Sequence, residues 1–182
     1  TSYDIIATAD ALKYKGFTNE ILIPEMTKLE STLINLALRE KDTIQIGRTH
    51  GQHAEPITFG FAIAQYVSRL GTSIVKIRKA ANNLRGKMAG AVGAYNASSL
   101  FIGNPVKFEE DVLSELKLKP SPMSTQIVEA EYLADYLSNI VSAFGVIANL
   151  ADDMRHLQRN EIGEVGELFE AKQVGSSTMP QK

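Results

Sequence analysis

The stretch TQIVEAEYLADYLSNIVSAFGVIANLADDMRHLQRN, residues 125–160, decides the fold class of this 182-residue chain. Its apolar side chains recur every three or four residues without a break, which predicts one long helix. The first apolar line runs through Ile127, Ala130, Ala134, Leu137, Val141, Phe144, Ala148 and Ala151. A second apolar line runs through Leu133, Ile140, Ile147 and Met154. Because two lines make a wide apolar face, we expect neighbours to cover this helix on more than one side, as in a helix bundle.

Two further segments have helical spacing. Apolar residues step by three or four from Ile57 to Leu84, and they do so for the most part from Asp4 to about Arg39. Pro24 lacks a backbone donor, so we expect a kink or a break near Ile23. At 1.5 Å per residue the two longest helices would be on the order of 40–50 Å long, too long for a chain of this size to wrap alone. The sequence therefore predicts an elongated all-α bundle that completes its core against other subunits.

The remaining segments are interpreted as connections. Residues 42–56 contain Gly47 and Gly51 and have no sustained period, which predicts a loop. The other predicted segments are a loop at 86–93, a short helix at 106–116 and a turn at 120–122. No β pattern of useful length competes with the helices.

Composition excludes several functional classes. The 19 Lys and Arg residues against 21 Asp and Glu residues leave a formal charge of −2, which excludes nucleic-acid binding by bulk positive charge. The absence of cysteine excludes disulfides, thiolate nucleophiles and Cys-ligated metals. Charges interrupt the apolar runs before 18 residues and no signal sequence is visible, so we expect a soluble protein with no membrane partner. Because the sequence opens without Met and stops within an apparent loop, we expect a segment of a longer chain.

The first candidate for chemistry is GRTHGQHAEP, residues 47–56, which places His50 and His53 in one connection. A histidine titrates near neutral pH and suits general acid or base catalysis. A solvated or helix-capping histidine is the alternative, and it stays open at this point. The His-x-x-His spacing also suits a metal, but no third ligand is evident, so we predict no metal.

The second group of candidates lies at loop and helix ends. GSSTMPQK, residues 175–182, is either a flexible surface loop or a mobile lid that carries a serine and a lysine over a bound anion. Thr1 and Ser2 before Asp4 resemble a helix N-cap with a capping-box acid. The segment 124–126, Ser-Thr-Gln, has the same appearance before the third long helix. Helix N-termini also bind carboxylates and phosphates, so capping and ligand binding both remain possible roles.

In this order, these elements resemble the fumarase/aspartase superfamily, the all-α homotetrameric lyases that release fumarate. The resemblance rests on GRTHGQHAEPITFG (47–60), MAGAVG (88–93), STQ (124–126) and GSSTMPQK (175–182). It implies a long-helix bundle of the fumarase/aspartase type. In it, residues 1–182 are a single central helical domain of a longer lyase, contributing to the tetramer core and ending in a mobile signature loop at 171–182.

Within the superfamily, THGQHAEP (49–56) and RHLQRNE (155–161) are most similar to adenylosuccinate lyases. This similarity implies a cytoplasmic enzyme of purine biosynthesis that cleaves a succinyl-nucleotide, adenylosuccinate to AMP or SAICAR to AICAR, with release of fumarate. An argininosuccinate lyase, a carboxymuconate cycloisomerase-like member and a catalytically silent helical scaffold are the alternatives.

The resemblance also implies the roles of individual residues. The reaction is an anti elimination without metal or organic cofactor: a base removes a proton beside a carboxylate, and an acid protonates the leaving group. Ser176 matches the base and His50 the general acid. The positions that match substrate-binding residues are Thr1, Ser2, Thr49, Gln126 and Lys182. His53 matches a residue behind these contacts or on the phosphate side, and His156 is expected to be structural.

Two departures from adenylosuccinate lyases bear on the substrate. Those enzymes usually have Asp-Thr where this chain has Ala7 and Thr8, and a basic stretch where this chain has VEAEY at 128–132. Both changes affect the expected contacts to the nucleotide phosphate. Because family sites are built from several subunits and from residues outside this segment, we do not expect residues 1–182 to be active alone.

Overall fold

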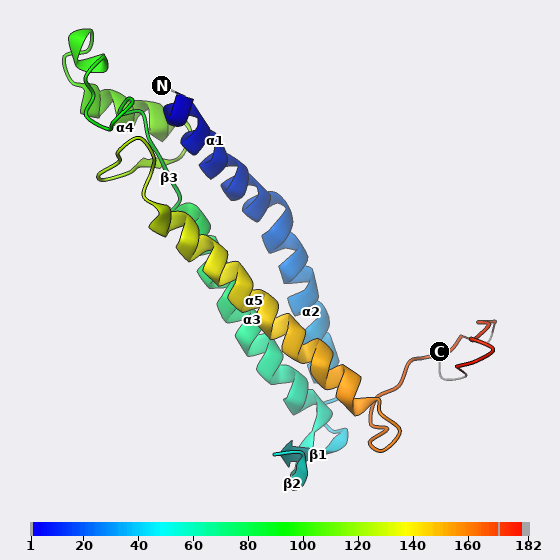
Figure 1. The fold of residues 1–182 in the computed structure, drawn as a ribbon. Helices are drawn as coiled ribbons and strands as arrows, with labels where there is room; N and C mark the ends of the chain where they lie inside the picture. Colours follow the sequence, from blue (N-terminus) through cyan, green and yellow to red (C-terminus); the bar gives the residue numbers. More distant parts are fainter. Residues whose placement is uncertain (1, 171, 180–182) are drawn as a thin grey trace.

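The computed structural model describes residues 2–170 and 172–179, and it is an elongated bundle of helices (Figure 1). In chain order the elements are α1 (Ser2–Phe17), the π-helical turn η1 (Thr18–Leu22), α2 (Ile23–Arg39), β1 (Ile44–Thr49), β2 (Gln52–Thr58), α3 (Phe59–Asn82), β3 (Arg85–Gly86), the 3-10 turn η2 (Ser98–Leu100), α4 (Pro105–Glu115), β4 (Lys119–Pro120) and α5 (Ala130–Leu157). Long helices make up the body of the molecule, which confirms the all-α prediction.

The helix α3 is at the centre of the core. It packs against α2 on one side and against α5 on the other. Its buried apolar residues recur at the predicted spacing of three and four: Ile63, Tyr66, Leu70, Ile74, Ile77, Ala80 and Ala81. The period of residues 57–84 predicted one long amphipathic helix, and α3 confirms it.

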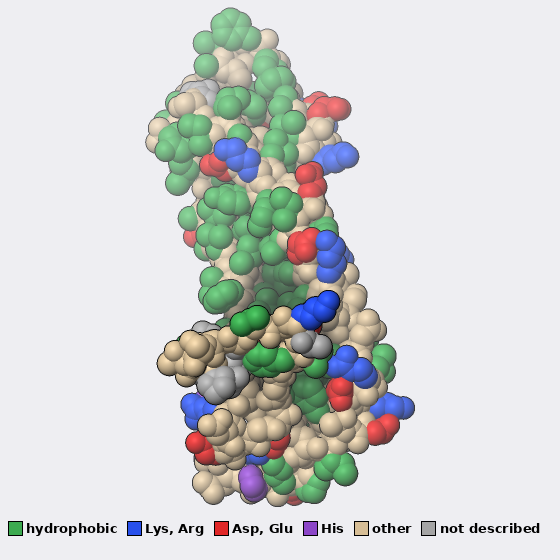
Figure 2. Space-filling model, turned by 90° about the vertical axis from the view of Figure 1, so that its right-hand side faces the viewer, with side chains coloured by type: hydrophobic (Ala, Val, Ile, Leu, Met, Phe, Trp, Pro, Cys, Tyr) green, Lys and Arg blue, Asp and Glu red, His purple; other side chains and the backbone are tan. Residues whose placement is uncertain are grey.

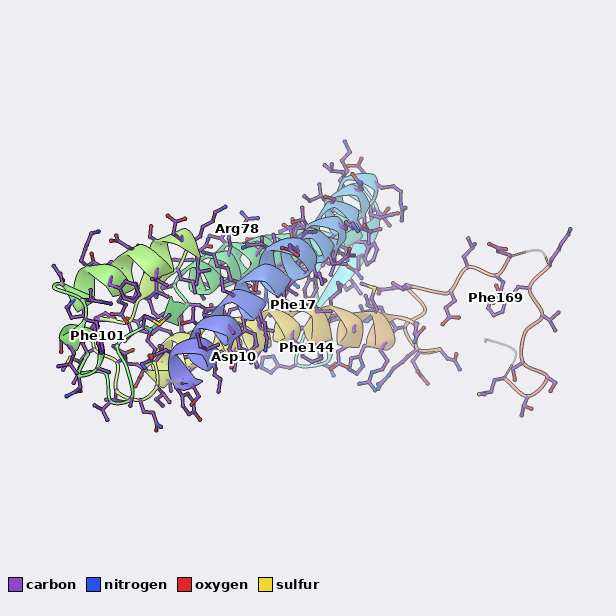
Figure 3. The ribbon with its side chains drawn as sticks, turned by 90° about the horizontal axis from the view of Figure 1, so that it is seen from above. Asp10, Phe17, Arg78, Phe101, Phe144 and Phe169 are labelled. Atoms are coloured by element: carbon purple, nitrogen blue, oxygen red, sulfur yellow. The ribbon has the colours of Figure 1, made fainter. Side chains whose placement is uncertain are left out.

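The two apolar lines of α5 have different neighbours. The second line, from Leu133 to Met154, packs against the core of this chain. The first line stays exposed: Val141 and Phe144 are each 69% exposed and Leu137 is 45% exposed. Figure 3 labels Phe144, which projects from α5. The chain therefore covers one apolar face of α5 and leaves the other open.

The total surface agrees with an incomplete core. The chain exposes 12214 Å², whereas a compact monomer of this mass exposes about 8,700 Å². Apolar side chains gather along the face that carries α1 (Figure 2). Two apolar residues of α1 are well exposed, Ile5 at 64% and Phe17 at 46%. Exposed apolar surface of this extent marks an interaction face.

Within the described part of the chain, α5 alone is long and apolar enough to cross a membrane. Its most apolar 18-residue window has a mean hydropathy of 1.3, and 17% of that window is buried. Because a helix in the middle of a soluble assembly has the same length and composition, these properties are weak evidence for a membrane span.

The kink between α1 and α2 occurs where Pro24 predicted it. The five residues of η1 form a π-helical turn just before Pro24, which occupies the first turn of α2. In this turn Thr18 is fully buried, and its Oγ1 lies 2.8 Å from the hydroxyl of Tyr136 on α5. The chain thus bends without a break and remains attached to α5 at the bend.

The predicted loop at 42–56 is wrong, because β1 and β2 pair there as an antiparallel hairpin. Thr49 pairs with Gln52, which leaves His50 and Gly51 as the two turn residues. Both have positive φ, 53° and 71°, as a type I′ hairpin turn requires. The register shifts between Ile46 and Arg48, where Gly47 of β1 lies opposite two residues of β2, Ala54 and Glu55. A Cβ on Gly47 would lie 2.8 Å from the carbonyl oxygen of Glu55.

The predicted start of the third long helix is also wrong. The helix α5 begins at Ala130, so Ser124 and Gln126 lie in an irregular segment and do not cap it. The carboxylate of Glu129 accepts hydrogen bonds from the hydroxyl of Ser121 and from the backbone N–H of Met123. These bonds turn residues 121–129 back on themselves, so the helix starts only after that turn.

We predict that Gly60→Ala destabilises the protein by about 1–3 kcal/mol, because overpacking forces backbone to move. A Cβ on Gly60 would lie 2.4 Å from the carbonyl oxygen of Ala37 at the end of α2. Urea unfolding of the intact protein measures the effect. Gly16→Ala is the control, since its Cβ would meet only Glu20 Oε1 at 4.0 Å, and it should be neutral or stabilising by about 0.5–1 kcal/mol. Equal losses in the two variants would contradict the close contact at Gly60.

Candidate functional site

Three of the predicted site residues lie together on the hairpin. His50 occupies the tip and is exposed, with Thr49 beside it on β1 and His53 on β2 opposite Arg48. The φ of His50, 53°, is uncommon for a residue other than glycine. Backbone in such a region persists only where the surrounding structure holds it, and it is concentrated at functional sites. The hairpin therefore presents an exposed imidazole in a defined backbone conformation.

An ion pair attaches this hairpin to the segment after α5. Arg48 Nη2 lies 2.5 Å from Glu164 Oε1, and Gln45 Nε2 donates to Glu164 Oε2 over 2.8 Å. The hydrogen bond from Arg48, with the one from Gln45, lowers the pKa of the Glu164 carboxyl, and the same bond raises the pKa of Arg48. Neither residue was singled out from the sequence, because no spacing relates two positions 116 residues apart.

A second polar cluster lies at the other end of the bundle, under the start of α1. The carboxylate of Asp4 is buried and lies 2.6 Å from Lys87 Nζ, which is fully buried and also donates to the carbonyl of Gly90 over 2.8 Å. Thr8 Oγ1 bonds both the N–H and the carbonyl of Lys87. These contacts hold the glycine-rich loop 88–93 against the first turns of α1, where Ser2 begins the helix. Thr1 lies outside the described residues.

A cavity of about 250 Å³ opens between α1 and the start of α5 at this end. Tyr3 and Ile127, the neighbours of Ser2 and Gln126, both line it. Its walls are mostly apolar, and the guanidinium of Arg85 lies 4.9 Å from the centre of the Tyr132 ring. Ala7 and four residues of the 128–132 stretch, Val128, Glu129, Ala130 and Tyr132, also line this cavity, so the fold brings the two departures noted in the sequence together.

The tail, the part of the chain after Val165, carries Ser176. It leaves the helices and extends into solvent (Figures 1 and 3). The Ser176 Oγ accepts hydrogen bonds from the backbone N–H groups of Thr178, at 3.3 Å, and Met179, at 3.2 Å. Two such donors favour negative charge on the oxygen, which is what a serine base needs. Lys182 lies outside the described residues, and within the described part no hydrogen bond joins the tail to the hairpin tip.

The site residues occupy opposite ends of the bundle. The start of α1 is bonded to Lys87, which follows the last turn of α3, whereas His50 precedes the first turn of α3 (Figure 1). The 24 residues of α3 span about 36 Å at 1.5 Å per residue. Ser2 and Gln126 are therefore too far from His50 for one small molecule to contact all three in a single copy.

A family model described as lyase matches residues 1–182. The chain belongs to this lyase family. The adenylosuccinate lyases of Archaeoglobus fulgidus and Thermotoga maritima are each 39% identical to it over 183 residues, with this chain covered completely and those proteins covered to 40% and 41%. The crystal structure of a fumarate lyase from Mesorhizobium sp. BNC1 is 24% identical and matches with a TM-score of 0.81 over 90% of this chain and 38% of that one.

These comparisons confirm the resemblance to the fumarase/aspartase superfamily and the fumarase-type fold. The lyase chain spans about 40% of the length of the curated relatives it matches. That residues 1–182 form one central domain with a signature loop at 171–182 stays a prediction. Among the described residues of the lyase, no three His, Cys, Asp or Glu side chains gather as metal ligands.

Proposed function

We propose that the intact protein is a fumarate-releasing C–N lyase that cleaves adenylosuccinate to AMP and fumarate, and SAICAR to AICAR, in purine biosynthesis. One observation carries this proposal: adenylosuccinate lyases from several organisms are 32–39% identical to the whole of this chain. The proposed enzyme is cytoplasmic and acts on a small-molecule substrate without a metal or an organic cofactor. We propose neither nucleic acid nor a membrane as a binding partner.

In the proposed reaction Ser176 is the base and His50 the general acid. Ser176, present as its alkoxide after its own proton has passed to solvent, takes up the proton beside a substrate carboxylate and becomes the neutral hydroxyl, while the C–H electron pair forms a carbanion spread over that carboxylate. His50 then donates a proton to the nitrogen as the C–N bond breaks. The backbone donors on Ser176 support its role, because they stabilise the alkoxide form that accepts the proton. The position of His50 also supports its role. Its side chain is exposed at the hairpin tip, so it can reach a substrate that is bound by a neighbouring copy.

The substrate contacts in this proposal come from both ends of the fold. Thr49 lies beside the acid, with His53 behind it on the neighbouring strand. At the other end Ser2 and Gln126 flank the apolar cavity. Thr1 and Lys182 are proposed as further contacts to substrate carboxylates, and they lie outside the described residues.

We propose that four copies form a homotetramer. Two observations support self-association: the site residues are separated by the length of α3, and the first apolar line of α5 has no cover within the chain. Packing one copy against another buries this line and brings the hairpin of one copy to the α1 end of another.

The lining of the cavity favours a second candidate within the same chemistry. The relatives' phosphate contacts are expected where this chain has Ala7 and the VEAEY stretch, and all of these residues except Glu131 line a mostly apolar space. A substrate without a phosphate, such as argininosuccinate or a carboxymuconate, is the alternative.

A substrate series tests the proposal. Intact protein should release fumarate from adenylosuccinate, followed by ultraviolet absorbance, and should not release it from argininosuccinate. Succinyladenosine, which lacks the phosphate of adenylosuccinate, tests whether the protein binds a phosphate. A similar kcat/KM for the two substrates would mean that the phosphate does not contribute to recognition and would favour the second candidate. Release from none of these substrates would overturn the proposed function and favour a carboxymuconate or a silent scaffold.

His50→Asn and Ser176→Ala should each lower the turnover number by about 10²–10⁴-fold, the range for loss of a general acid or base. Asparagine adopts positive φ readily, so the hairpin of the first variant should stay folded with an unchanged melting temperature. His156→Asn, an exposed histidine in the last turn of α5, is the control and should keep the rate of the unsubstituted protein. Rates within twofold for both of the first two variants would remove His50 and Ser176 from the chemistry.

Mixing two inactive variants tests the shared site. If a site takes His50 from one copy and Gln126 from another, random reassembly of His50→Asn with Gln126→Ala leaves about a quarter of the sites with both native residues. We expect fumarate release to recover to about 25% of the native rate after the two are unfolded and refolded together. If both residues of a site came from one copy, mixing would restore nothing.

A further inference from the structure

We propose that Glu164 is a positioning residue for the proposed acid, holding the His50 hairpin against the end of α5 and thereby setting the direction in which the imidazole meets the substrate. This inference rests on the proposed function for its effect on turnover. The attachment itself is argued from the contacts of the hairpin alone.

The hairpin has little packing of its own. In β1 and β2 the one buried residue is Gln45, and the other strand residues are half-buried or exposed. The buried amide of Gln45 donates to Glu164, while its Oε1 is buried with no hydrogen-bond partner among the described residues. Because the amide oxygen of Gln45 has no partner in the described part of the chain, the hydrogen bond from its Nε2 to Glu164 is the polar contact that fixes the position of this side chain. The contact with Glu164 therefore sets the position of β1.

Both carboxylate oxygens of Glu164 accept hydrogen bonds from side chains of the hairpin. Oε1 accepts from Arg48 and Oε2 from Gln45, so the carboxylate bridges the two ends of β1. The guanidinium of Arg48 also donates to the carbonyl of Ile46 over 3.3 Å. The Arg48 and Glu164 side chains are 22% and 23% exposed, so the pair is shielded more than an ordinary surface ion pair. Arg48 lies two residues before His50, so its bond to Glu164 also restricts the movement of the hairpin tip.

Glu164 is itself held by the end of α5. Its backbone N–H donates to the carbonyl of Leu157 over 2.9 Å, after a left-handed turn at Gly163. The last turns of α5 are in turn joined to α3 by the hydrogen bond from Tyr66 to Asp153. The support behind the carboxylate is therefore two packed helices.

The charges around Glu164 keep it ionised. Arg48 lowers its pKa through a hydrogen bond, and the charge of His53 acts in the same direction. A second pocket is lined by Glu164, Gln45 and Glu40, but the Glu40 carboxylate bonds to Arg39 and Thr43. An ionised carboxylate makes charge-assisted bonds, which are stronger and more directional than neutral ones.

Glu164→Gln in the intact protein tests the proposal, with Glu161→Gln, an exposed carboxylate in the same turn, as the control. We expect kcat to fall between about tenfold and a hundredfold, as for a small misplacement of a catalytic group, with KM within twofold. In the His50→Asn background the same substitution should change kcat by less than about twofold, because a positioning residue acts through the group it positions. An equal loss in both backgrounds would mean a general structural role and would overturn the proposal.

Hydrogen exchange gives a readout that does not depend on activity. The backbone N–H groups of Arg48 and His53 should exchange at least about tenfold faster in Glu164→Gln than in Glu161→Gln, with the helices unchanged. If native protein released no fumarate but the hairpin still exchanged faster, the proposed function would fail and the attachment would stand. Unchanged exchange in Glu164→Gln would overturn the attachment whatever the activity.

Discussion

Nine of the 24 residues of α3 are buried, whereas α5 buries three of its 28. This asymmetry arises because α3 packs between two helices and α5 packs against one. Each outer helix uses one face to cover α3 and leaves its other face to solvent. The same central helix keeps the hairpin and the glycine-rich loop at opposite ends of the molecule. The separation of the candidate site residues is thus a consequence of how the core is built.

Periodicity predicted the helices because burial on a helix repeats every three to four residues. It identified two apolar lines on α5 but carried no information on which neighbour covers each. The hairpin escaped prediction because the alternation of Ile44, Gln45 and Ile46 lasts only three residues before the register shift at Gly47 ends it. The start of α5 escaped it because a side-chain contact, from Glu129 to Ser121, competes with the helical pattern.

The candidate site, like the fold, was predicted only in part. A loop histidine suits proton transfer, which made His50 a candidate. The role of Ser176 came only from the resemblance to the family, and both roles stay predictions. The ion pairs that fix the backbone near the predicted contacts were not visible in the sequence. Lys87 and Asp4 are 83 residues apart, and Arg48 and Glu164 are 116 apart. A contact over such a separation depends on the tertiary fold, and no local spacing predicts it.

The exposed apolar line and the divided site have one common solution in the proposed assembly. In the proposed tetramer a second copy buries the line on α5, and a neighbouring copy also brings a hairpin to a distant α1 end. The free energy that holds the copies together would then come from apolar surface far from the chemistry, while the polar contacts at each end only orient the groups. In the proposed tetramer, stability and activity would be coupled through assembly, because a separated copy would lack both a cover for the apolar line of α5 and the site residues that another copy contributes.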